Sequence, residues 1–136
     1  MVPAPVTPHT AHVRQLAALL RRYDVSIAAL DQLLTRRDDN PGLVGSADWL
    51  QQDATLAQEL LTEYHDAALL SPTATDAELQ ECVVEALRLT SLGATMLHDG
   101  FLTDGHGAYY LGAHGNWNLN LGRQRIQRCR SILAGS

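Results

Sequence analysis

The sequence contains no lysine, so all ten of its basic residues are arginines, and fifteen acidic residues outnumber them. The resulting net charge of −5 argues against a general nucleic-acid-binding protein, which usually presents a basic face. The charge is also uneven, because residues 106–136 contain four arginines and no acid. Such a segment either packs against acidic neighbours of the same fold or forms a basic contact surface.

The sequence also has few cysteines and no long apolar run. The two cysteines, Cys82 and Cys129, are too few and too far apart in sequence for a disulfide scaffold or a zinc knuckle. We therefore expect both to be buried, reduced thiols. No apolar run approaches the roughly 20 residues needed to cross a bilayer, and the N-terminus lacks the pattern of a signal peptide. We predict a cytoplasmic protein without membrane contact.

The length of 136 residues and a hydrophobic content of 46 % predict a single domain over 1–136, with residues 1–7 as a flexible tail. Apolar residues do not alternate with period two over any useful length, which excludes a strand-rich fold. Instead they recur at spacings of three and four, the pattern of helices packed in a bundle. The first three predicted helices span residues 8–38, 46–70 and 76–98.

The segment from residue 98 to residue 122 differs from the rest of the chain, because it holds three of the six histidines, four of the seven aromatic residues and six of the ten glycines. Gly112, Gly115 and Gly122 fall on one apolar row with 4-3 spacing. We interpret residues 104–134 as a fourth long helix, which completes an antiparallel four-helix bundle. A glycine-rich aromatic loop ending near Asn116 is the alternative.

Another interaction must offset the cost of the glycines in this predicted helix, since each glycine costs about 1 kcal/mol relative to alanine in a helix interior. We interpret Gly112, Gly115 and Gly122 as a seam along which the helix closely approaches a neighbouring helix. A seam of this kind predicts that Gly115→Ala is nearly neutral, whereas Gly115→Leu destabilises the fold by overpacking.

The fourth predicted helix has a second row of large side chains beside the seam. This row and its neighbours are the candidate interface or ligand-binding residues, namely His106, Tyr109, Tyr110, His114, Trp117 and Leu121. Exposed aromatic rows mark interfaces or ligand surfaces, and a symmetric homodimer would cover this one. The arginines flank the seam, with Arg123 and Arg130 on one side and Arg125 and Arg128 on the other. We expect ion pairs with neighbouring acidic helices there.

Few features of the sequence favour a metal site or an enzyme active site. His98, His106 and His114 are each eight residues apart, a spacing that rotates side chains by about 80° and separates them by ~12 Å along a helix. From a single continuous helix they cannot all meet on one ion, so a metal site would need the loop alternative or a ligand from another segment such as His65. We expect His9 and His12 to lie in a solvated first turn. No nucleophile elbow, phosphate-binding loop or dinucleotide motif is present. We therefore predict no metal and no cofactor, and no motif supports an enzyme.

Residues 19–34, LLRRYDVSIAALDQLL, resemble the helix-turn-helix motif of DNA-binding proteins in their apolar spacing. The positions that this motif buries are occupied by Leu19, Tyr23, Val25, Leu30 and Leu33. The resemblance covers a short stretch and departs at the turn, where Asp24 replaces the usual glycine. It implies a DNA-binding regulator, whereas the unbroken apolar stripe predicts one straight helix.

Three functions therefore follow from the sequence. The first is a regulatory or accessory protein that acts by protein–protein contact and forms a homodimer through its aromatic C-terminal segment. The second is a small-molecule sensor or sequestering protein, with a pocket lined by Tyr109, Tyr110, His114 and Trp117. The third is the DNA-binding regulator.

Overall fold

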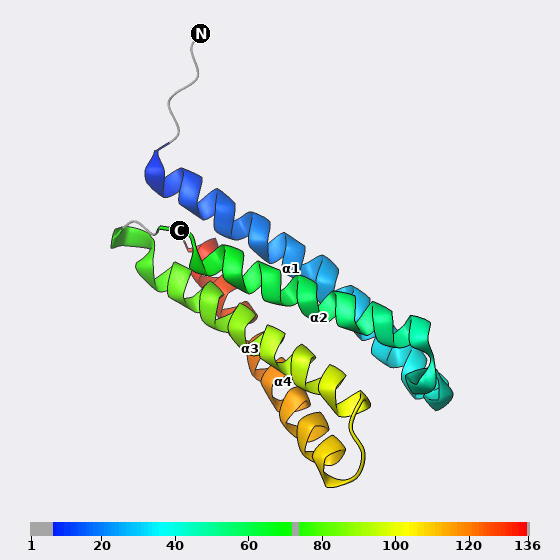
Figure 1. The fold of residues 1–136 in the computed structure, drawn as a ribbon. Coiled ribbons are helices and arrows are strands. Elements are labelled where there is room, and N and C mark those ends of the chain that lie inside the picture. The colour runs from blue at the N-terminus through cyan, green and yellow to red at the C-terminus, as the bar shows by residue number, and fades with distance from the viewer. Residues whose placement is uncertain (1–6, 72–73, 136) are drawn as a thin grey trace.

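The computed structural model describes residues 7–71 and 74–135, and within these residues it shows helices and no strands. Successive helices run antiparallel to one another (Figure 1), so the predicted all-α four-helix bundle is confirmed. The helices are α1 (Pro8–Asp39), α2 (Ala47–Ala68), α3 (Ala77–Phe101) and α4 (His106–Ala134), with short 3₁₀ turns η1 (Pro41–Gly45) and η2 (Ala74–Asp76). The predicted tail lies, but for Thr7, outside the described residues.

Helix α1 is continuous over 32 residues, with helical backbone through Asp24, Val25 and Ser26. The single straight helix expected from the apolar stripe is confirmed. The resemblance to a helix-turn-helix is misleading here for two reasons. There is no turn, and Val25, which that motif would bury, is 73 % exposed.

In the first turn of α1, His9 is exposed as expected, whereas His12 is not. The His12 side chain is buried and its Nε2 lies 2.8 Å from Oε1 of Gln80. Asp76, at the N-cap of α3, approaches two histidines, with Oδ1 2.6 Å from Nδ1 of His9 and Oδ2 3.3 Å from Nδ1 of His12. The start of α1 therefore packs against the start of α3, which the local sequence of α1 does not reveal.

Leucines from three helices form the centre of the core. Leu16, Leu30, Leu60 and Leu87 are almost completely buried, and each contributes about 1.5–3 kcal/mol by leaving water. Trp49 closes one end of the bundle. Its ring lies edge-on to that of Phe101 with centroids 5.1 Å apart, and its Nε1 donates a hydrogen bond of 3.1 Å to the Leu33 carbonyl. This residue ties the start of α2 to the ends of α1 and α3.

Helices α3 and α4 touch backbone to backbone. A Cβ atom added to Gly93 would lie 2.7 Å from the carbonyl oxygen of Gly115, and one added to Gly115 would lie 3.0 Å from that of Gly93. Farther along, a Cβ at Gly122 would lie 3.1 Å from the Thr90 nitrogen. Glycine is required at these positions because any side chain would separate the helices.

The glycine-rich segment is thus helical from His106 onward, and the loop interpretation is wrong. Two of the three predicted seam glycines, Gly115 and Gly122, face α3. Gly112 does not need to be glycine, because a Cβ built there has no heavy atom within 4 Å. The sequence also gave no sign of Gly93, which supplies the other half of the closest contact. The backbone takes a positive φ, of 70°, only at Gly105 among the described residues, directly before α4.

The contact distances at the seam change the prediction for Gly115. Because even a methyl group would lie within 3.0 Å of the Gly93 carbonyl oxygen, Gly115→Ala is expected to lower the free energy of unfolding by about 1–3 kcal/mol through overpacking. Gly112→Ala is the matched control in the same helix, and open space predicts a stabilisation of up to ~1 kcal/mol from helix propensity. Urea unfolding of both variants measures the difference. Equal effects of the two substitutions would contradict the seam.

Candidate protein-contact surface

At the loop end of the α3–α4 pair, α4 lies on the side of α3 that faces away from α1 and α2 (Figure 1). In this part of α4, the seam side packs on α3 and the opposite side is uncovered. We call the uncovered row the aromatic face, comprising His106, Tyr109, Tyr110, His114, Trp117 and Leu121. Tyr109 is 80 % exposed, Tyr110 57 % and Trp117 65 %. These large apolar groups lie in solvent on a regular helix.

Most of the aromatic face forms a single line because α4 is an unbroken helix. His106, Tyr110, His114 and Trp117 follow at intervals of three or four residues, so they lie above one another on the same side. The rings of Tyr110 and His114 are in contact, with centroids 4.2 Å apart. Leu121 ends the row and is partly buried. The face is therefore preformed rather than assembled from separate loops.

A small hollow of about 240 Å³, lined by Ala113, His114 and Trp117, lies on the aromatic face. The two tyrosines do not line this hollow, although the sequence suggested a pocket formed by Tyr109, Tyr110, His114 and Trp117. Ligand pockets usually have volumes of about 300–1,000 Å³. The geometry suits contact with a broad surface better than enclosure of a small molecule.

The aromatic face also has no formal charge with its histidines neutral, since residues 105–122 contain no Asp, Glu, Lys or Arg. The arginines of α4 lie from Arg123 onward, in its C-terminal half, and three of them pair with acids of α1 and α3. Arg123 and Arg130 pair with Asp31 and Asp24 of α1, while Arg128 lies 3.7 Å from Glu78 of α3. The ion pairs predicted for the two flanks are thus confirmed for these three arginines, and they fix the C-terminal half of α4 on the bundle.

The histidines are distributed among different environments. His98 Nδ1 lies 2.8 Å from Oδ2 of Asp53, a buried carboxylate of α2. His106 and His114 lie on the exposed side of α4. Over residues 7–71 and 74–135, no group of three or more histidine, cysteine, aspartate or glutamate side chains is placed to hold a metal ion.

Glu63 is the most deeply buried acid of α2. Its side chain is inaccessible to solvent, and Oε2 accepts a hydrogen bond of 2.6 Å from the Ser26 hydroxyl. Oε1 has no hydrogen-bond partner. Burial raises the pKa of Glu63 above its ordinary value of 4.5, and the bond from Ser26 opposes that rise only in part. The pair joins α1 to α2 at a cost in charge desolvation.

The raised pKa of Glu63 predicts a pH-dependent stability. The folded protein binds this proton more tightly than the unfolded chain does, so its stabilising effect is complete at low pH and is lost as pH rises through the folded-state pKa. The free energy of unfolding should therefore decline as pH rises from 4.5 through that raised value. Glu63→Gln should remove this component of the decline.

Urea unfolding at a series of pH values checks this prediction. Glu81→Gln, which removes an exposed carboxylate from α3, is the control and should keep the wild-type decline. An unchanged decline in Glu63→Gln would show that Glu63 is not the responsible group.

No family model, curated protein or solved structure matches this chain. No helix in the described part of the chain combines the length and the apolar character needed to cross a membrane.

Proposed function

We propose that the protein acts by protein–protein contact and forms a homodimer through the aromatic face of α4, in a regulatory or accessory role. The observation that carries this proposal is an uncovered row of rings on a regular helix. Tyrosine and tryptophan are enriched at interfaces because they bury a large apolar area while losing little conformational entropy. A second copy of the same face would cover them.

The absence of charge on the aromatic face favours a second copy of this chain as the partner. A twofold axis places each surface patch against itself, so a patch with one sign of charge would repel its own copy. The whole chain has a net charge of −5, yet residues 105–122 carry none. Two such faces can meet without juxtaposing like charges.

The size of the face predicts a reversible dimer of modest affinity. Aromatic side chains bury about 150–250 Å² each, so the exposed parts of Tyr109, Tyr110 and Trp117 together offer about 400 Å². That is roughly half of the ~800 Å² per partner in a standard interface. We therefore expect a dissociation constant on the order of micromolar, a range in which cellular concentration controls assembly.

We also propose that the protein is located in the cytoplasm. Cys82 and Cys129 are both free thiols, and free thiols persist in the reducing compartments of the cell.

Trp117 provides the most direct test. Trp117→Ala should weaken the dimer by about 2 kcal/mol, or roughly thirtyfold in dissociation constant, because central tryptophans are frequent interface hot spots. Sedimentation equilibrium over a range of concentrations gives this constant. Val25→Ala on α1 is the control, since Val25 is equally apolar and 73 % exposed but lies outside the aromatic face. It should leave the constant unchanged.

Two results would contradict the proposed dimer. One is a wild-type protein that stays monomeric at every concentration tested, and the other is equal weakening by Trp117→Ala and Val25→Ala. Acrylamide quenching supplies a second measurement, because Trp117 is 65 % exposed whereas Trp49 is almost fully buried. Quenching should fall as concentration rises if the aromatic face becomes covered.

A further inference from the structure

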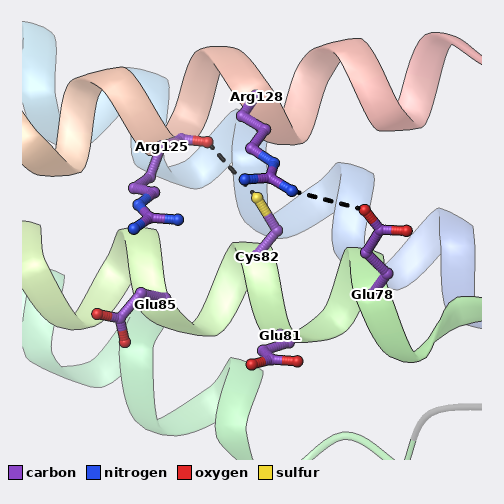
Figure 2. A pocket seen from close by; sticks show the side chains of 6 residues that line it. All are labelled: Glu78, Glu81, Cys82, Glu85, Arg125 and Arg128. Carbon is purple, nitrogen blue, oxygen red and sulfur yellow. Dashed lines mark hydrogen bonds and ion pairs between the residues drawn. The ribbon is translucent and has the colours of Figure 1, made fainter.

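A second surface feature lies between α3 and the C-terminal half of α4, where the arginines of α4 are located. It is a groove of about 420 Å³ with mixed charge (Figure 2). Its lining residues are Glu78, Glu81, Cys82, Glu85, Arg125 and Arg128. Among them Cys82 is the single nucleophile, and the aromatic face contributes nothing to this groove.

Cys82 is in contact with the other cysteine of the chain. The Sγ atom of Cys129 lies 3.0 Å from that of Cys82 and donates its thiol hydrogen toward it. Cys82 in turn lies 3.7 Å from the carbonyl oxygen of Arg125 (Figure 2). A disulfide bond has an S–S length of about 2.05 Å. The two sulfur atoms therefore need to approach by only about 1 Å to become bonded.

The two thiols differ in their access to solvent. Cys129 has no exposed surface, whereas Cys82 is 8 % exposed and lines the groove. Burial, together with the contact with Cys82, raises the pKa of the Cys129 thiol, which therefore keeps its proton. A solute in the groove meets Cys82 first and reaches Cys129 only through it.

The limited access to Cys82 selects among possible oxidants. Three glutamates and two arginines line the groove, so their charges nearly balance and do not select an oxidant by charge. Because Cys82 is only 8 % exposed, a bulky oxidant such as a glutathione-type disulfide has little access to its sulfur. A small molecule reaches it more readily, and hydroperoxides fit this description.

The geometry points to Cys82 and Cys129 as a hydroperoxide-oxidised thiol pair that forms a disulfide between α3 and α4. The Cys82 thiol gives up its proton and its sulfur attacks one oxygen of the hydroperoxide, the O–O bond breaks, and the departing oxygen takes up that proton and leaves as an alcohol (water, for hydrogen peroxide). Cys82 becomes a sulfenic acid. The Cys129 sulfur then attacks it, the S–O bond breaks, and the hydroxyl leaves as water with the Cys129 proton. Two thiols and one hydroperoxide thus give one disulfide, one alcohol and one water.

This reaction would lock the α3–α4 pair. The bond would join residues 47 positions apart, and closing such a loop restricts the unfolded chain. The oxidised protein is expected to unfold at a temperature higher by about 10 °C. This inference does not depend on the proposed dimer, because it concerns a different surface and its product forms within one chain.

The reaction can be followed on the reduced, full-length protein with hydrogen peroxide as the probe. Intact mass spectrometry and thiol titration should show that both thiols disappear together, with loss of two hydrogens from a monomeric chain, and that dithiothreitol restores them. In Cys129→Ser, the reaction should stop at a Cys82 sulfenic acid that dimedone traps. In Cys82→Ser, the remaining Cys129 thiol should react at least roughly tenfold more slowly than the Cys82 thiol does in Cys129→Ser, because Cys129 is buried.

Circular dichroism identifies any variant that fails to fold, and Cys129→Ala then replaces Cys129→Ser. Several results would overturn the inference. These are equal reactivity of the remaining thiol in the two single variants, oxygen addition without a disulfide, and a disulfide between chains. Glutathione disulfide provides the second arm, and oxidation of the pair by it as fast as by hydrogen peroxide would refute the assigned class of oxidant.

Discussion

The close approach of α3 and α4 is the contact on which the rest of this structure depends. Gly93 and Gly115 allow the two backbones to meet with no side chain between them, and Gly122 repeats this against Thr90. Glycine is unfavourable in an isolated helix, so the packing of this interface must offset that cost. It does so by burying one side of α4 along α3, while Tyr109, Tyr110 and Trp117 in the N-terminal half of the same helix stay exposed.

Helix α4 is consequently divided into two functional halves. Its C-terminal half is held on the bundle by Arg123, Arg128 and Arg130, which pair with acids of α1 and α3. Its N-terminal half has no charged residue and carries the exposed rings of Tyr109, Tyr110 and Trp117. The C-terminal half provides rigidity, and the N-terminal half provides a surface. A rigid aromatic row loses little entropy when it is covered, which is the physical basis for proposing it as the contact surface.

The buried polar groups show how α1, α2 and α3 are fixed relative to one another. The pairs are Ser26 with Glu63, Asp53 with His98, and His12 with Gln80. Each joins side chains of two different helices, and each would leave an unsatisfied buried group if one helix slid along or rotated against its partner. The contact between Cys82 and Cys129 depends instead on the register between α3 and α4, which the glycine contacts set.

The sequence by itself determined the number of helices, their approximate ends and the unbroken course of α1, and it left the glycine-rich segment open between a helix and a loop. The determined properties follow from the spacing of apolar residues and from N-caps, because the side chains of Thr7 and Ser46 accept hydrogen bonds from the backbone N–H groups of Thr10 and Trp49, within a few residues. Only the tertiary structure decided that Gly93 faces Gly115, that Gly112 faces open space, and that His12 is buried. It also decided that two cysteines distant in sequence touch. Each of these depends on the rotation and axial shift of one helix against another, which the combined packing of all four helices sets and no local pattern records.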